Sequence, residues 1–581
     1  MYRNFYSFRV KTVDRKFVSA SGTNYRQTAL ISFFDADDHL ITTVGYGLAD
    51  IDEVYDEIEK TGRVILDEAY TRNFSLTAWR RLNLIPKDEN VVIQEVKANN
   101  AFFDVYSCID FSNITIRNGE AHFRETVFHG GDIDFRHSVF ENANIDFSNM
   151  LHRKGGINFD SVKVHQGQLI FKNAIFCSGI KKFQYAHFVE TPVDFTNCEF
   201  NDGDINMVDT RFSGGLSFKV ARFGNGRIGF QFARFSGNDV SFDRASFGVG
   251  DIDFRTTEFT GIKLNFNRCL AGEGSWDFSG AEFDNAKATF KKVQLGRGKV
   301  DFSDTVFRNS DLVFARAETQ EALLNFENAV LFTADFSYCF FNRYLNFRIQ
   351  SAEKLDFTYA VVRDILDMHL PEHGKPVPVL LFADMSLPGI LYIDWHKNNV
   401  KAAIYNQGEN TTHLQKALQF LMIKENFSRN GQYEIEDLAY VEYRRCLAHS
   451  RRLGAAGNFR KKIAGWGAFM LDRILLDLTG LYGTSPKRVF ATMIIMYALF
   501  SFAYILIILT GIGDILVSVG AEHDLPLISK GFYHSAITML TIGYGDHFPV
   551  GLARALSAVQ GFVGMLLLSY FTVTLVHKIL R

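Results

Sequence analysis

The stretch Asp132–Phe140, "DIDFRHSVF", contains the pattern on which the middle of the chain is built. Ile133 and Phe135 are two residues apart, and so are Ser138 and Phe140, so each pair can point to one side of a short strand. The two phenylalanines lie five residues apart, and the next one in the series follows seven residues later. This spacing fits no helix and predicts short strands joined by corners of alternating length.

Phenylalanine recurs every twelve residues on both sides of this stretch, with one interval of eleven. The chain has 57 Phe among 581 residues, so a regular series of this length is not accidental. We therefore predict a β-solenoid in which the rings stack in columns along the axis, with glycines such as Gly131, Gly203 and Gly226 in the longer corner. The series comprises Phe111, Phe123, Phe135, Phe147, Phe159, Phe171, Phe183, Phe195, Met207, Phe218, Phe230, Phe242, Phe254, Phe266, Phe278, Phe290, Phe302, Phe314 and Phe326.

The pattern resembles the pentapeptide-repeat family, whose units place a small residue and a Leu or Phe inward on each side of a square coil. The resemblance covers residues 101–360, most clearly from Phe102 to Ala360, and implies a right-handed β-solenoid. Alternate units are seven residues long instead of five, so the resemblance does not decide whether the cross-section is square. If two twelve-residue units make one coil, the series gives about nine or ten coils and a stack of about 45 Å.

Two uncharged apolar runs lie near the C-terminus, at Val489–Gly511 and Ala555–Val576. Each is long enough to cross a hydrocarbon core of about 30 Å as a helix. Lysine and arginine are frequent before the first run and follow the second, whereas the connection between the runs has only Lys530 and Arg554. This distribution predicts a multi-pass protein of the cell inner (plasma) membrane with both termini in the cytoplasm.

Between these runs, Gly531–Leu540 is amphipathic but too short to cross a membrane, which predicts a re-entrant pore helix. The segment "TIGYG" follows it, and its two glycines allow the backbone to turn successive carbonyls to one side. Such carbonyls and a threonine hydroxyl can replace the hydration shell of a cation. We expect the ion site at Thr541, Ile542, Gly543 and Tyr544, with Gly545 completing the strand, Tyr544 packing outward and Asp546 at the outer mouth.

The stretch Thr538–Asp546, "TMLTIGYGD", resembles the signature of potassium channels, and the resemblance covers Val489–Arg581. It is similar to the subunit type with two transmembrane helices and one pore. This resemblance implies K⁺ as the permeant ion, no cofactor, and a homotetramer, because one strand cannot enclose an ion. Gly561 and Gly564 lie within the second apolar run, where they either allow close helix packing or form a gating hinge.

A second pentapeptide of this form, "TVGYG" at Thr43–Gly47, has a different setting. Acidic residues surround it, and no neighbouring run is long enough to enter a membrane. We interpret it as a strand end and a turn in an N-terminal α/β domain, residues 1–100, with a helix near Asp52–Thr61. This domain would cap the repeat stack, which needs a polar end.

Residues 361–485 are predicted to connect the repeat to a pore domain at 486–581. The segment Gly465–Gly483 is amphipathic and has basic neighbours, which suits a membrane interface. The arrangement resembles the connector of bacterial repeat-containing channels. A cytosolic signal is expected to reach the pore through the first apolar run or through contacts between subunits. The predicted connector helices are Thr412–Ser428, Tyr433–Leu453 and Phe459–Leu481.

Composition argues against several other classes. The formal net charge of −3 gives no general attraction for nucleic acid, and the six cysteines include no CxxC pair that would indicate a zinc site. No paired base and nucleophile stands out, so an enzyme is not expected. The leading hypothesis is a potassium-selective channel subunit. The alternatives are a non-selective cation channel and a membrane-anchored scaffold with a vestigial pore.

The role of the solenoid stays open at this stage. It can be an assembly scaffold or spacer, a sensor that biases the gate, or a surface for a cytosolic protein or small-molecule regulator, a role that the N-terminal cap could share. The partners expected of the pore domain are membrane lipid and other copies of the chain. The gating stimulus is not defined by the sequence.

Overall fold

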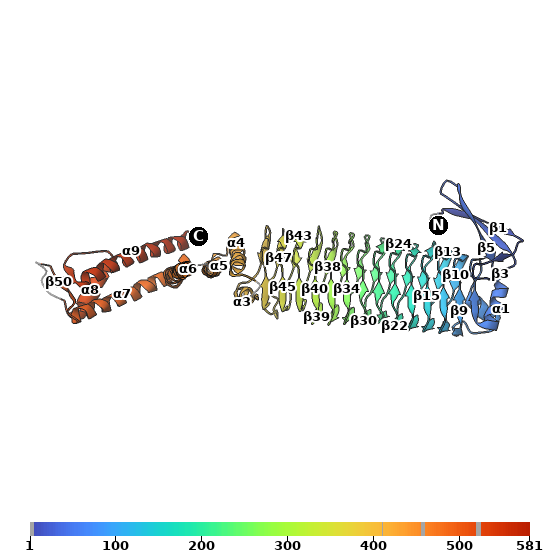
Figure 1. Ribbon diagram of the computed structural model, residues 1–581, viewed down its shortest axis with the longest axis horizontal. Helices are drawn as coiled ribbons and strands as arrows, with labels where there is room; N and C mark the ends of the chain where they lie inside the picture. The colour runs from blue at the N-terminus through green and yellow to red at the C-terminus, as the bar shows by residue number, and fades with distance from the viewer. Residues whose placement is uncertain (1–4, 409–410, 455–458, 519–524, 581) are drawn as a thin grey trace. The chain divides into compact units, whose positions relative to one another are not determined.

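The computed structural model describes residues 5–408, 411–454, 459–518 and 525–580. It contains two compact units, Met1–Asn406 and Gln407–Arg581. The first unit is dominated by a β-solenoid, and the second is helical (Figure 1).

One coil of the solenoid consists of four short strands. They are illustrated by β16 (Leu151–His152), β17 (Ile157–Asn158), β18 (Lys163–His165) and β19 (Gln168–Ile170). The next coil begins with β20 (Ile175–Phe176), which pairs in parallel with β16. Leu151 lies opposite Ile175, so one coil is 24 residues long and contains two twelve-residue units.

The phenylalanine side chains form the predicted columns in the interior. The ring centroid of Phe278 lies 4.9 Å from that of Phe254 and 4.7 Å from that of Phe302. The rings are stacked nearly parallel, with interplanar angles of 6° and 0°. A second column meets the first edge-on, because Phe266 and Phe278 are inclined at 88°. Each aromatic pair in these geometries contributes about 1 kcal/mol beyond the area it buries.

The shorter corner places a residue in the left-handed region two positions after each main phenylalanine. Asn149 and Asn173 have φ values of 60° and 59°, and the side-chain amide of Asn173 donates to Asn149 Oδ1 at 3.2 Å. The conformation costs about 1 kcal/mol for a residue other than glycine. The parallel strand ladders on both sides of the corner offset this cost.

The longer corner contains a column of glycines that the packing requires. A Cβ atom on Gly179 would overlap the carbonyl oxygen of Gly155 in the preceding coil, and one on Gly203 would overlap that of Gly179. Successive coils therefore approach so closely here that no side chain fits. The column continues through Gly226, Gly250, Gly274 and Gly298.

The coils extend beyond the segment in which the phenylalanine interval can be recognised. One sheet of the solenoid has 14 strands, from β6 (Arg63–Ile65) through β9 (Glu95–Lys97) to β48 (Val379–Leu381). At about 4.8 Å per coil, this sheet measures about 60 Å. It is longer than the interval alone predicts, because coils at both ends use other apolar residues in the core.

One position in this regular core is occupied by a buried lysine. Lys181 in β21 (Lys181–Lys182) lies between Ile157 and Ile205 of the adjacent coils and is 1% exposed. Its Nζ donates to the carbonyl oxygen of Cys177 at 2.6 Å and lies 3.4 Å from that of Gly203. Burial lowers the pKa of Lys181 to about 8.

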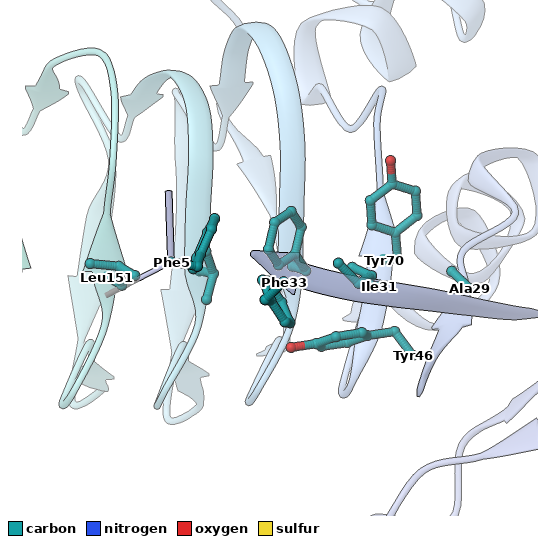
Figure 2. Packing of buried hydrophobic residues seen from close by; sticks show 9 residues of the cluster. Phe5, Ala29, Ile31, Phe33, Tyr46, Tyr70 and Leu151 are labelled. Carbon is teal, nitrogen blue, oxygen red and sulfur yellow. The ribbon is translucent and has the colours of Figure 1, made fainter. Parts of the chain in front are cut away.

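An antiparallel sheet packs on the first coils of the solenoid. It consists of β1 (Ser7–Val13), β4 (Thr28–Phe34) and β5 (Leu40–Leu48), and is followed by α1 (Ile51–Thr61). Phe33 and Tyr46 from this sheet join a buried cluster with Leu151 of the solenoid (Figure 2).

The first TVGYG pentapeptide, Thr43–Gly47, lies inside β5 and pairs with β4 along its whole length. The expected turn was therefore wrong, whereas the position near the end of a strand is confirmed, because β5 ends at Leu48. Its backbone groups are engaged in a sheet of the N-terminal region, which fits a structural role.

The second unit begins with the connector. The first two connector helices form a hairpin at Gly431, whose φ is 69°, and a capping box between Thr412 and Gln415 begins the first one. The third predicted helix is divided into an α-helix, a π-helical segment η1 (Asp472–Leu478) and a short 3₁₀ turn. The α-helices of this unit are α4 (His413–Arg429), α5 (Tyr433–Gly454), α6 (Phe459–Leu471), α7 (Pro486–Leu509), α8 (Leu527–Met539) and α9 (Leu552–Ile579).

Candidate ion-conduction site

Two helices of the second unit, α7 and α9, are long and apolar enough to cross a membrane. They cover the predicted runs with slightly wider bounds. Large apolar side chains on them point away from the rest of the chain, including Phe502 at 62% exposed and Phe562 at 60%. Surfaces of this kind need lipid or another subunit to cover them.

The short helix α8 lies between α7 and α9 and contacts both. Strands β50 (Gly513–Val517) and β51 (His547–Gly551) pair antiparallel and hold the two ends of the α8 segment together. The predicted pore helix is therefore present, and it begins four residues earlier than the sequence indicates, at Leu527.

Polar side chains join these three helices inside an otherwise apolar bundle. The amide of Gln560 in α9 donates to the carbonyl oxygen of Ser535 in α8 at 3.0 Å and to its hydroxyl at 2.6 Å. The hydroxyl of Tyr504 in α7 donates to Gln560 Oε1 at 2.8 Å. Gln560, Ser535 and Tyr504 are fully buried. Sequence reasoning missed them, and the only signal was the presence of polar residues within apolar runs.

The segment Thr541–Gly545 has no regular secondary structure, follows the end of α8 and is exposed in the single chain. Thr541, Gly543 and Gly545 have φ values of 54°, 58° and 78°, so the backbone alternates in handedness along it. Tyr544 is 70% exposed. The outward packing of Tyr544 as a brace therefore stays a prediction.

Asp546 follows this segment and is held by its neighbours. The hydroxyl of Tyr533 in α8 donates to Asp546 Oδ2 at 2.7 Å, and Nδ1 of His547 lies 3.1 Å from the same oxygen. These contacts fasten the end of the Thr541–Gly545 segment to the side of α8. Tyr533 and His547 were not identified from the sequence.

The two glycines of the second span have different surroundings. A Cβ atom on Gly564 would overlap the carbonyl oxygen of Met539 at the end of α8, whereas a Cβ on Gly561 would meet nothing within 4 Å. Helix α9 runs unbroken through both positions. Gly564 is thus required by close packing, and the hinge role stays a prediction for both.

The end of α9 contacts the connector within the same chain. Lys578 Nζ forms an ion pair with Asp437 Oδ2 in α5 at 2.9 Å. In η1, Asp477 forms an ion pair with Arg445 of α5 at 2.8 Å. The connector and the end of α9 are therefore in direct contact, and the two signal routes expected from the sequence stay predictions.

Comparison with known proteins adds one match. Residues 522–581 match the family model described as "Ion channel", and this range includes α8, the Thr541–Gly545 segment and α9. No curated protein and no solved structure matches the chain. This match agrees with the presence of two apolar helices and a short helix between them. The C-terminal part of the chain is therefore an ion-channel module of a membrane protein.

Proposed function

We propose that the chain is one subunit of a potassium-selective channel that assembles as a homotetramer. The observation that supports this most directly is the exposed, irregular Thr541–Gly545 segment at the end of a short helix between two apolar helices. Irregular backbone at membrane depth is tolerated only where it lines a water-filled path or is covered by protein. Four such segments around one axis would satisfy both conditions.

In this proposal, K⁺ is dehydrated by backbone oxygens. The carbonyls of Thr541, Ile542, Gly543 and Tyr544 from each subunit would replace its water shell. The C-terminal end of α8 is adjacent to the segment, and its negative dipole end favours a cation there. The hydrogen bond from Tyr533 to Asp546 would keep the outer end of the segment in place.

We further propose that the cytosolic part regulates the pore through α5. The ion pair between Asp437 and Lys578 links α5 to the end of α9, which would line the inner pore. The Lys578 side chain is 43% exposed, and ion pairs of this kind contribute at most about 1 kcal/mol. A contact of this strength can break and form during gating. Both termini would then lie in the cytoplasm, as the basic residues near both apolar runs indicate.

The test is ion flux through the purified protein in liposomes, with K⁺ compared with Na⁺. A preference for K⁺ is expected. Equal rates for both ions would instead assign a non-selective cation channel, and the absence of any flux would assign a scaffold with a vestigial pore.

A matched pair of variants tests the filter itself. Gly543→Ala is expected to reduce K⁺ flux about tenfold or more, because alanine is strained at a φ of 58° in every subunit. Gly45→Ala changes the equivalent glycine of the first pentapeptide, where the new Cβ would meet Thr28 Cγ2 at an ordinary 3.6 Å. It is expected to leave flux unchanged. Undiminished flux in Gly543→Ala would refute the filter assignment.

A further inference from the structure

One corner of the solenoid carries a basic side chain in each of four successive coils. Each of these residues follows a main phenylalanine by two positions and is exposed, and they are Arg244, Arg268, Lys292 and Arg316. They occupy equivalent positions, because the backbone N–H of Arg244 donates to the carbonyl oxygen of Asn267 in the next coil, and that of Arg268 to Lys291. Neighbouring coils lie about 4.8 Å apart, so the four residues form a basic column about 14 Å long.

The backbone at this corner does not favour basic residues. The four φ values are 58°, 59°, 57° and 64°, in the left-handed region that asparagine adopts more readily than arginine or lysine. Earlier coils have asparagine at this position, and the amide of Asn197 donates to Asn173 Oδ1 at 2.9 Å. In the four later coils cations take that place, so repulsion between like charges is added to the backbone strain.

The charge of the column is largely uncompensated within the chain. The corner residues 243–244, 267–268, 291–292 and 315–316 include five basic residues and one acidic residue, a formal charge of +4. Arg244 Nε lies 3.6 Å from Asp243 Oδ2, whereas Arg268 and Lys292 form no ion pair with any residue that the structure describes. Strain and repulsion without a local compensating contact are typical of a functional surface.

Two stacked tyrosines continue the column in the next two coils. The ring centroids of Tyr338 and Tyr359 are 4.8 Å apart, with an interplanar angle of 18°. The guanidinium of Arg316, in the coil before Tyr338, lies 5.4 Å from the centroid of the Tyr338 ring. Both faces of Tyr338 are therefore covered by the protein itself. Single-stranded nucleic acids are usually bound by bases that stack on open aromatic faces, so this arrangement does not favour them.

We propose that the basic column binds an α-helix of another protein that carries acidic residues along one face and lies parallel to the solenoid axis. Carboxylates at successive turns of such a helix are about 5.4 Å apart, close to the spacing of about 4.8 Å between coils. Over three intervals the two repeats differ by about 2 Å, which flexible lysine and arginine side chains can absorb. One face of an extended strand repeats every 6.8 Å or so and would differ by about 6 Å.

The column is also too narrow for a membrane surface. The residues that lie two positions beyond it along the chain are Ser246, Leu270, Gln294 and Glu318, and none of them is basic. A planar anionic surface would meet this neighbouring row as well, whereas a single helix would not. The proposed docking surface belongs to the solenoid and does not rest on the channel assignment.

The test measures binding of labelled synthetic peptides to the full-length protein in phosphatidylcholine nanodiscs by fluorescence anisotropy. One peptide is an alanine-rich helix with a glutamate at each of four successive turns on one face. The other has the same composition, with the glutamates spread around the helix. The one-faced peptide is expected to bind about tenfold more tightly, because it can form about two more ion pairs at about threefold each.

A matched pair of protein variants locates the binding. Arg268→Asn with Lys292→Asn is expected to weaken binding of the one-faced peptide about tenfold, again from about threefold per exposed ion pair. Asparagine suits the backbone, since Asn149 and Asn173 occupy the same corner position with φ values of 60° and 59°. The control carries Lys163→Asn and Arg227→Asn, which remove the same charge from exposed positions outside the column.

Each result decides the assignment. Preference for the one-faced peptide, with a loss confined to the column variant, supports the proposal. Equal binding of the two peptides or equal losses in the two variants would show diffuse attraction and overturn it, as would the absence of binding. Tighter binding of oligouridine or of phosphatidylglycerol vesicles, lost in the column variant, would overturn the helix assignment in favour of nucleic acid or membrane. Melting temperatures equal to wild type in both variants exclude misfolding as the cause of a loss.

Discussion

Replacing the buried Lys181 with isoleucine is expected to stabilise the solenoid at neutral pH. The side chain is 1% exposed in a column whose neighbours are both isoleucine, so isoleucine fits the space. Burial lowers the pKa of Lys181 from 10.5 to about 8, which corresponds to about 3 kcal/mol. Loss of the hydrogen bonds from Nζ opposes this by about 1 kcal/mol, so the net gain is about 2 kcal/mol.

The stabilisation by isoleucine is expected to depend on pH, because the pKa of Lys181 differs between the folded and unfolded chains. Below pH 8, Lys181 is protonated in both folded and unfolded chains, and its contribution to stability is constant. Between pH 8 and 10.5 the unfolded chain binds the proton and the folded chain does not, so the free energy of unfolding of wild type rises with pH by up to about 3 kcal/mol. The isoleucine variant lacks this rise. Its advantage of about 2 kcal/mol should therefore disappear and reverse by about 1 kcal/mol at high pH.

The assay is urea denaturation followed by far-UV circular dichroism between pH 7 and 11. Lys182→Ile provides the control, because Lys182 is the next residue in the strand and is exposed. A difference between Lys181→Ile and wild type that does not change with pH would refute the reasoning. So would an equal effect of the Lys182 substitution.

Three further predictions concern the pore, the connector and the core. Gly564→Ala should abolish most K⁺ flux because the new methyl group overlaps the end of α8, whereas Gly561→Ala should not; equal flux in the two would contradict the packing. Asp437→Lys should change the fraction of time that single channels are open, and the charge exchange with Lys578→Asp should restore it; failure of the exchange would argue against the ion pair. Phe278→Ala should destabilise the solenoid by about 4 kcal/mol in the same urea assay, and a loss below 1 kcal/mol would contradict the stacked column.

The parts of the fold that were predicted from sequence are those in which one residue type recurs at a strict interval or in which a long run has no charged residue. The spacing of phenylalanines such as Phe135 and Phe147 predicted the coils of the solenoid, because each of these side chains lies in the interior. The coils around Val64 and Val96 were missed, since their core residues follow no interval that a single sequence reveals. The apolar runs identified α7 and α9 because a membrane span needs only length and absence of charge.

The contacts that complete the candidate site could not be predicted from the sequence. The ion pair between Asp437 and Lys578 joins residues 141 positions apart, and nothing in either local sequence indicates the other. The same is true of Tyr533 and Asp546, whose separation along the chain does not show that they meet. Such pairs depend on how whole helices pack, so they were found only in the structure.

The glycine column of the longer corner restricts how the solenoid can change in length. Removing 24 residues would leave each glycine of the column above another glycine and would keep the register of the strands. Removing twelve residues after Gly250 would instead place Ala286 above it, where a methyl group overlaps the backbone of the coil below. A deletion of half a coil is therefore not tolerated within this glycine column. The reach of this domain is a quantity that evolution, or an engineer, can adjust only in steps of about 4.8 Å.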